Sequence, residues 1–129
     1  YEGMNELLQT GKISSYPQMH AVQSQAVHPV CKKFDTLYRR KASSIVDAII
    51  PPWDPPRLPN VVDIIKKTQG FGWVVSDDIV VENQSWLRNQ EIETSNEGAL
   101  ALGGYYKARE TFELLNPIPI ILLTGKKYD

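Results

Sequence analysis

Apolar residues recur along the start of the chain with two different periods, and each period predicts an element. Met4, Leu7 and Leu8 follow one another at the spacing of a single helix face. Gly11 is placed to end that helix as the residue just after its last turn. Residues 19–23 then alternate between apolar and polar side chains, which predicts a β-strand.

Two further helices are expected in the middle of the chain. Pro29 suits the first turn of a helix, where its missing N–H costs nothing. The apolar face of this helix would consist of Val30, Phe34, Leu37 and Tyr38. Asn60 can cap a second helix over residues 61–69, and Gly70 can close it.

A strand–helix–strand succession is predicted next. Residues 71–75 read as a strand, and Ser76 is placed as the N-cap of the following helix. Asp77 and Asp78 lie in its first turn, where the helix dipole favours negative charge. This helix would carry Ile79, Val80, Asn83, Trp86 and Leu87. A brief strand over residues 91–93 is expected after it.

The last third of the chain predicts a helix of small residues and a final strand. Thr94 with Glu97 three residues later fits a capping box at a helix start. The helix over residues 98–109 contains three glycines, each costing about 1 kcal/mol relative to alanine. A helix tolerates that cost when another backbone or a flat ligand must come close. Residues 120–123 form an apolar run that suits a buried parallel strand.

Strands and helices alternate in this reading, which predicts an α/β fold with three layers, a mainly parallel sheet flanked by helices. Ligands of such sheets bind beyond the carboxyl ends of the strands. Thr94 and Ser95 follow one predicted strand, and Thr124 and Gly125 follow another, so these pairs are the best ligand-facing candidates. The competing interpretation is structural: a helix cap at the first pair and a simple turn at the second.

The segment 51–59 holds five of the nine prolines and excludes helix or central strand. It could be a ligand for a proline-recognising domain, but an ordered loop is favoured inside a compact α/β pattern. The segments on either side are each too small to fold alone. We therefore expect residues 1–129 to form a single unit.

Composition narrows the classes of function. The chain is 42% hydrophobic and 22% charged, like an ordinary globular protein, and its net charge is −1. It lacks the cluster of basic residues that binding to nucleic acid or an anionic membrane would require, so neither partner is expected. The single cysteine, Cys31, reads as a structural thiol and favours a reducing, cytoplasmic setting. His20 and His28 have no metal-ligand spacing, and no metal is expected.

Six segments, in order, resemble the second half of threonine synthase and its fold-type-II pyridoxal-phosphate relatives. None is specific alone, but together they cover nearly the whole chain. The last two resemble the family's "EPSS" and "VVLTG" segments. The segments are residues 1–13 (YEGMNELLQTGKI), 17–29 (with HAVQSQ), 41–49 (KASSIVDAI), 70–79 (GFGWVVSDDI), 93–104 (ETSNEGALALGG) and 121–129 (ILLTGKKYD).

The resemblance implies pyridoxal phosphate as cofactor and an amino acid as substrate. The reaction would be a β- or γ-replacement or elimination, as in threonine synthase, a cysteate-synthase-like enzyme or a threonine/serine dehydratase. Thr124 matches the threonine whose hydroxyl meets the cofactor's ring nitrogen, with Gly125 beside it. Ser95 matches a position near the ring in related enzymes.

The departures from the family are equally informative. No segment matches the one that carries the imine-forming lysine, or the glycine-rich loop that holds the cofactor phosphate. Lys41, in a basic stretch, is not a substitute, and Thr94 stands where the family has proline. The chain is therefore expected to be a C-terminal cofactor-domain fragment, inactive alone, whose partners are a missing N-terminal half or second chain and, in a homo-oligomer, its own copies.

Two alternatives stay open. The chain could be a free-standing, non-catalytic α/β interaction module that pairs with a separate half. A weaker interpretation makes residues 39–43 (RRKAS) a phosphorylation site in a signalling adaptor.

Overall fold

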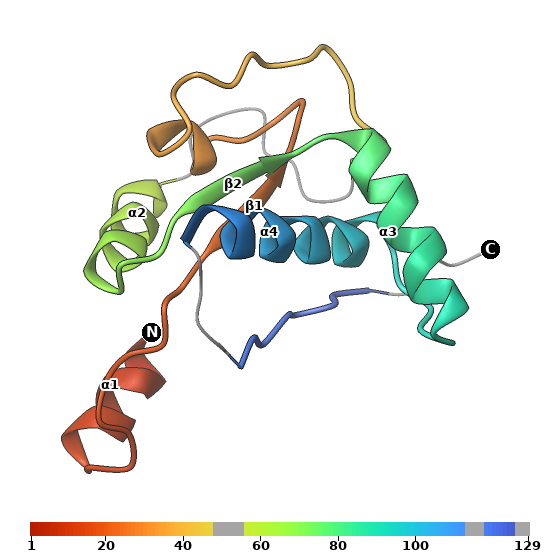
Figure 1. Ribbon diagram of the computed structural model, residues 1–129. Helices are drawn as coiled ribbons and strands as arrows, with labels where there is room; N and C mark the ends of the chain where they lie inside the picture. Colours follow the sequence, from red (N-terminus) through yellow and green to blue (C-terminus); the bar gives the residue numbers. More distant parts are fainter. Residues whose placement is uncertain (48–55, 113–117, 126–129) are drawn as a thin grey trace.

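The computed structural model describes residues 1–47, 56–112 and 118–125, and these form a mixed α/β structure (Figure 1). Within them lie a two-stranded parallel sheet, four α-helices and one 3₁₀ turn. In chain order the elements are α1 (Glu2–Gln9), β1 (Ala21–Ser24), η1 (Cys31–Lys33), α2 (Leu58–Lys67), β2 (Gly72–Val75), α3 (Asp77–Asn89) and α4 (Asn96–Phe112).

The two strands confirm the first two strand predictions, with slightly different ends. They pair in parallel, from Ala21 opposite Gly72 to Ser24 opposite Val75. Every residue of β2 is buried, as expected for a strand covered on both faces. The expectation of a parallel α/β sheet is thus met in its coarse form, with two strands among the described residues.

Helix α4 covers one face of the sheet, and it does so at very short range. A Cβ added at Gly104 would lie 2.2 Å from a methyl group of Val22, and one at Gly103 would lie 2.8 Å from a methyl group of Val75. Both valines belong to the strands. The glycines of α4 therefore let the helix approach the branched side chains of the sheet, which offsets their low helix propensity.

The other face of the sheet is covered by η1 and α2. A Cβ added at Gly72 would lie 2.8 Å from the ring of Phe34 and 2.9 Å from the Cα of Cys31. This side has its own buried cluster, formed by Val30, Leu58, Val62 and Ile65. The chain around η1 differs from the prediction, because the helix expected after Pro29 is only a 3₁₀ turn and Leu37, assigned to its buried face, is 91% exposed.

The helix starts were predicted less accurately than the helices themselves. Helix α2 begins at Leu58, inside the expected proline-rich loop, and Pro59 lies in its first turn. Asn60 is therefore within the helix and is not its cap. Ser76 does precede α3 as predicted, but its side chain makes no capping hydrogen bond. The rest of the proline-rich loop, residues 51–55, lies outside the described residues.

Three helices end in the same way, with a left-handed residue after the last turn. Gly11 (φ 68°), Gln69 (φ 58°) and Glu91 (φ 60°) occupy this position after α1, α2 and α3. At α3, the Ile92 N–H then donates to the Leu87 carbonyl at 2.9 Å. Gly11 confirms the prediction, whereas the strand expected over residues 91–93 is wrong because those residues complete a helix end.

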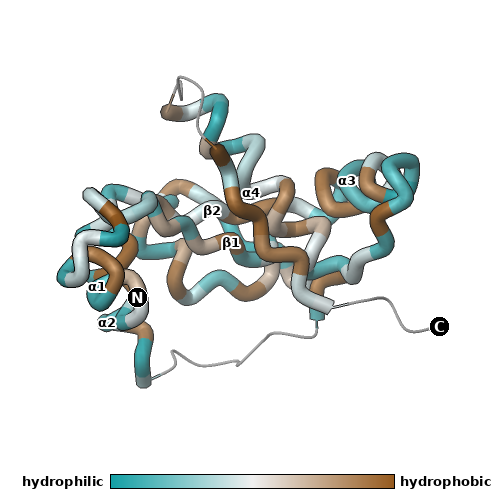
Figure 2. The backbone as a smooth tube through the Cα atoms, turned by 90° about the horizontal axis from the view of Figure 1, so that it is seen from below, coloured by the Kyte–Doolittle hydropathy of each residue, from teal (hydrophilic) through white to brown (hydrophobic). Residues whose placement is uncertain are grey.

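The predicted final strand is also absent from the described part of the chain. Residues 118–125 pair with neither strand, and their side chains are largely in solvent: Ile118 is 94% exposed and Ile120 is 85% exposed. Figure 2 shows this segment as an apolar stretch passing close to α4. Only Ile121 packs against the core, so the expectation of a buried strand over residues 120–123 is wrong.

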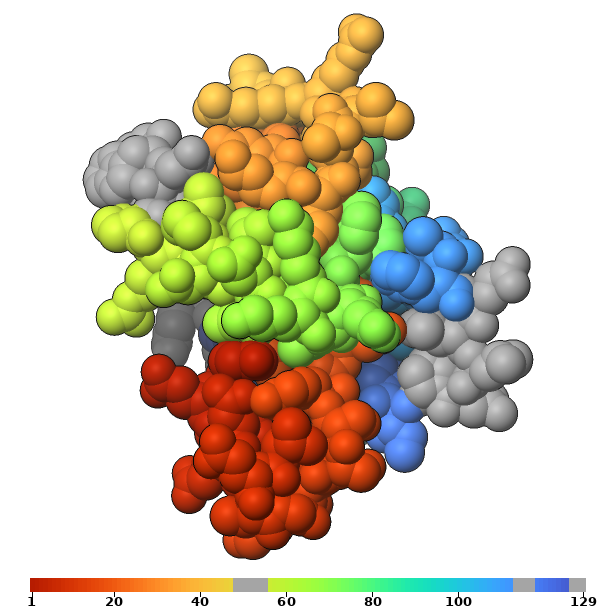
Figure 3. Space-filling view, turned by 90° about the vertical axis from the view of Figure 1, so that its left-hand side faces the viewer, coloured from red at the N-terminus to blue at the C-terminus, as the bar shows by residue number. Residues whose placement is uncertain are grey.

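Helix α1 lies apart from the sheet, at one end of the molecule (Figures 1 and 3). It has no fully buried residue. The Tyr1 ring stacks on that of Tyr16 at 5.4 Å, and the Tyr16 hydroxyl donates to the side-chain oxygen of Asn5. None of the helices in the described ranges is long and apolar enough to cross a membrane.

Candidate functional site

The two pairs of residues singled out from the sequence lie together in the structure. The Ser95 hydroxyl donates to the Thr124 carbonyl at 2.9 Å, and the Ser95 N–H donates to the Gly125 carbonyl at 3.3 Å. The Thr94 hydroxyl is 3.5 Å from the Gly125 carbonyl. Residues 29 positions apart in the chain thus form one site at the N-terminus of α4.

Ser95 also has the structural role that competed with the functional one. Helix α4 begins at Asn96, so Ser95 is the residue in the N-cap position. Its hydroxyl oxygen is 3.4 Å from the Gly98 N–H, the geometry of a serine cap. The capping box was expected to pair Thr94 with Glu97, and this is wrong because the cap is Ser95. Gly98, three residues later, has no side chain to complete a box. Because Ser95 donates its only hydroxyl proton to Thr124, it positions that residue.

Thr124 and Gly125 present different groups at this site. Gly125 adopts φ +86°, and a Cβ there would lie 3.2 Å from the Ser95 hydroxyl oxygen, so both conformation and space favour glycine. Thr124 is exposed, and only its carbonyl is engaged by Ser95. Within the described residues the Thr124 hydroxyl has no hydrogen-bond partner.

A second set of polar contacts fixes the neighbouring segment 43–46 over the starts of α3 and α4. The Ser44 hydroxyl donates to the Asp77 carboxylate at 2.6 Å, and the Asn96 amide donates to the Ile45 carbonyl at 2.6 Å. Val46 inserts into the core and is 2% exposed. The sequence placed Asp77 in a helix start for its charge alone, and this contact across 33 positions had no local signal.

Gln25 adds a link between this segment and the sheet. Its side-chain oxygen accepts from the Asp77 N–H at 3.2 Å, and its side-chain nitrogen donates to the Ser43 carbonyl at 3.0 Å. Gln25 immediately follows β1, and Asp77 lies two residues after β2. Side-chain amide and carboxylate groups therefore lie at the carboxyl ends of both strands.

Cys31 and His28 carry potentially reactive side chains, and both are buried in the structure. Cys31 is fully buried, and burial raises the pKa of its thiol to about 12, so the thiol stays protonated at neutral pH. This confirms its reading as a structural thiol. His28 is buried with its Nδ1 3.0 Å from the Ser24 carbonyl. No group of three or more histidine, cysteine or carboxylate side chains in the described ranges could hold a metal ion.

The capping role of Ser95 can be measured directly. Ser95→Ala removes the acceptor for Gly98 and the donor to Thr124, and we expect it to lower the free energy of unfolding by about 1 kcal/mol. The matched control is Ser85→Ala, since Ser85 lies inside α3 and donates only to the Val81 carbonyl of its own helix. That change should alter stability by less than about 0.5 kcal/mol in urea titrations. Equal effects of the two substitutions would contradict the assigned cap.

Comparisons of the chain with protein-family models, with curated proteins and with solved structures found no match. Membership of a family therefore remains a proposal. Its support is the order of the six segments in the sequence and the meeting of Ser95 with Thr124 in space.

Proposed function

We propose that the chain is the C-terminal region of a pyridoxal-phosphate-dependent enzyme of amino-acid metabolism, similar to threonine synthase. The observation that carries this proposal is the hydrogen bond from Ser95 to the Thr124 carbonyl. It brings together, at the N-terminus of α4, the two positions that the resemblance assigns to the cofactor ring. Nothing in local helix or strand chemistry requires these two segments to meet.

The residues present fit the cofactor in their chemistry. A pyridine nitrogen accepts a hydrogen bond, and the Thr124 hydroxyl is a donor without a partner in the described part of the chain. Ser95 holds the Thr124 backbone in place, and Gly125 avoids the 3.2 Å contact that a Cβ would make with the Ser95 hydroxyl. When bound, the cofactor supplies an electron sink for carbanion chemistry on an amino acid. A neutral hydroxyl at the ring nitrogen makes that sink milder than a carboxylate would.

The chain's own residues in this proposal bind and orient. Thr124 would donate a hydrogen bond to the cofactor ring, Ser95 positions Thr124, and the segment 43–46 lies at the carboxyl ends of the strands. The imine-forming lysine and the phosphate-binding loop are proposed to come from an N-terminal half or a second chain. The chain alone is then not catalytic, and the assembled protein is proposed to be a homo-oligomer.

Substitution of Thr124 tests the proposal in the assembled protein. Thr124→Val removes the donor while keeping the shape, and we expect cofactor affinity to fall by about 5- to 150-fold, the value of one hydrogen bond to a buried acceptor. Thr124→Ser retains the hydroxyl and is the matched control, with affinity close to that of the original protein. The measurement is a titration with pyridoxal phosphate followed by the imine absorption band.

The outcomes separate the parts of the proposal. Equal affinity of Thr124→Val and the original protein would remove Thr124 from the site but leave the enzyme class standing. An assembled protein that binds no pyridoxal phosphate would overturn the class. An imine band formed stably by this chain alone would contradict the proposal that the lysine lies elsewhere.

A second candidate function is a non-catalytic module that binds another chain. It is favoured by the row of exposed apolar side chains on the segment 118–125, where Leu122 is 73% exposed in addition to Ile118 and Ile120. Exposed rows of this kind mark interaction surfaces. A protein that associates with a partner but binds no cofactor in the titration above would support this function over the first.

A further inference from the structure

His20 is the meeting point of two hydrogen-bond donors from a distant part of the chain. Its Nδ1 accepts from the Phe71 N–H at 3.2 Å and from the Trp73 indole N–H at 3.1 Å. His20 immediately precedes β1, and Phe71 immediately precedes β2. The imidazole therefore joins the amino ends of the two strands through side-chain contacts in addition to their ladder.

These two donors determine the protonation state of the ring. An N–H group offers no lone pair, so Nδ1 can accept only while it carries no proton. The neutral tautomer with its proton on Nε2 is thus the one that fits. A second proton, on Nδ1, would point toward the Phe71 N–H and the Trp73 indole N–H, and both hydrogen bonds would be lost.

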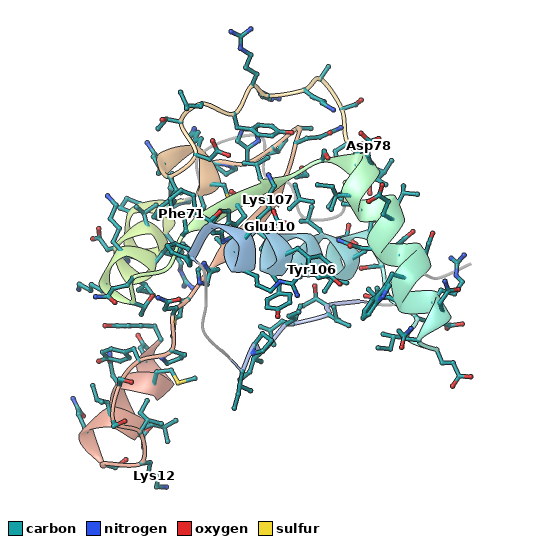
Figure 4. The ribbon with its side chains drawn as sticks, in the orientation of Figure 1. Lys12, Phe71, Asp78, Tyr106, Lys107 and Glu110 are labelled. Atoms are coloured by element: carbon teal, nitrogen blue, oxygen red, sulfur yellow. The ribbon has the colours of Figure 1, made fainter. Side chains whose placement is uncertain are left out.

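The surroundings of His20 are aromatic. Its ring lies roughly parallel to the Trp73 ring at a centroid distance of 6.1 Å and is tilted against Phe112, the last residue of α4, at 5.9 Å. Phe71, labelled in Figure 4, packs against Trp73 at 4.6 Å. The cluster joins β2, the end of α4 and the segment that leads from α1 into β1.

Among the described residues, burial and not a neighbouring charge is the cause of the lowered pKa of this imidazole. Strand β2 carries no titratable side chain, and Thr68, the residue directly after α2, contributes a hydroxyl that accepts from the Met19 N–H at 3.1 Å. On α4, the Lys107 ammonium donates to the Val74 carbonyl of β2, and Figure 4 labels Lys107 beside that strand. The Arg109 guanidinium lies over two tyrosine rings. Glu110, the other charged residue in the last turn of α4, is exposed.

We propose that His20 is a pH-sensitive clasp, which holds the segment before β1 against β2 and the end of α4 while neutral and releases it when protonated. The segment it controls carries α1, the helix that lies apart from the sheet (Figure 1). This inference is independent of the proposed cofactor chemistry, because the clasp lies at the amino ends of the strands, opposite Ser95 and Thr124.

The direction of the pH effect follows from burial, which lowers the pKa of His20 below its ordinary value of 6.5. The unfolded chain then binds a proton at a higher pH than the folded chain does. The stabilisation by the clasp is complete above about pH 6.5 and is lost as the pH falls through the lower pKa of the folded state.

The test replaces His20 with asparagine, whose side-chain oxygen can occupy the position of Nδ1 and accept from both donors without titrating. Hydrogen exchange of the Trp73 indole and the Phe71 amide is followed by NMR between about pH 5 and pH 8. In the original protein we expect exchange to become about tenfold faster on acidification than in His20→Asn at the same pH. Comparison at equal pH removes the intrinsic pH dependence of exchange.

A second measurement keeps the proposal falsifiable if His20→Asn fails to fold. The nitrogen shifts of the His20 ring in the original protein report directly which nitrogen carries the proton at neutral pH, and we expect it on Nε2. A proton on Nδ1 would overturn the proposal, as would an unchanged acid response of Trp73 in a folded His20→Asn protein. His28→Asn is the matched control, since His28 is the only other histidine and should leave the Trp73 response in place.

Discussion

Replacing Gly70 with alanine is expected to lower the free energy of unfolding by about 3 kcal/mol or more. An added Cβ would lie 1.8 Å from the carbonyl oxygen of Met19 and 2.6 Å from its carbonyl carbon. Both are backbone atoms, so no rotamer change can relieve the clash. The segment before β1 would have to move away from the loop between α2 and β2, and with it the start of the sheet.

The position is constrained from both sides. The Gly70 N–H donates to the Ile65 carbonyl at 2.9 Å and completes the end of α2, while the Met19 N–H donates to the Thr68 hydroxyl at 3.1 Å. A shift that accommodates the methyl group therefore breaks hydrogen bonds on one side or the other. The cost is that of overpacking together with unsatisfied backbone groups.

Gly3→Ala is the matched control for this prediction. Gly3 lies in α1, and a Cβ added there meets nothing within 4 Å. The same chemical change should raise stability slightly, by up to about 1 kcal/mol, because alanine is the better helix former. Urea unfolding of both proteins measures the difference. A loss of less than about 1 kcal/mol in Gly70→Ala would show that the Met19 backbone does not constrain this position.

Gly70 also illustrates what the sequence could and could not predict. The residue was expected to end α2 in the left-handed conformation that glycine adopts at no cost. In the structure Gln69 adopts that conformation, with φ 58°, and Gly70 is required by the close approach of Met19. A glycine after a helix is a local signal, but the reason for it came from a segment about fifty residues earlier.

The strand predictions show the same difference between what local sequence and what distant partners determine. Residues 19–23 and 71–75 were recognised because alternation and β-branched side chains are local properties, and β1 and β2 fall within or next to these ranges. Residues 120–123 have an equally apolar composition. A buried strand needs neighbours that cover it, and of residues 120–123 only Ile121 packs against the core cluster, while Ile120 and Leu122 are 85% and 73% exposed. Composition predicts the preference for burial, and the partners decide whether burial occurs.

The candidate site was predicted in its members but not in its assembly. Ser95 and Thr124 were each chosen because they follow expected strands, and one of those strands is a helix end while the other is unpaired in the described chain. Their contact is real in the structure although the reason for choosing them was partly wrong. From the sequence, His20 was only excluded as a metal ligand, and its role had no local signal because its two donors, Phe71 and Trp73, lie more than fifty positions away.

Replacing Leu87 with alanine should show where the stability of the chain resides. Leu87 is 3% exposed and belongs to the cluster between α3, α4 and β2, the larger of the two buried clusters. Its neighbours there include Val80, Leu100 and Leu102. Removal of three buried carbon atoms leaves a cavity that helices anchored at both ends cannot fully close, so we expect a loss of about 2 to 5 kcal/mol.

Leu37→Ala provides the same chemical change without burial, because the Leu37 side chain is 91% exposed. Its effect should be within about 0.5 kcal/mol, and the difference between the two variants in urea unfolding isolates the contribution of the cavity. Because a domain of this size is stable by only about 5 to 15 kcal/mol, the loss at Leu87 would remove a large share of the total. A loss at Leu87 as small as the one expected at Leu37 would mean that α3 is not packed against α4 in solution. The N-terminus of α4 would then lack the rigid support on which the meeting of Ser95 and Thr124 depends.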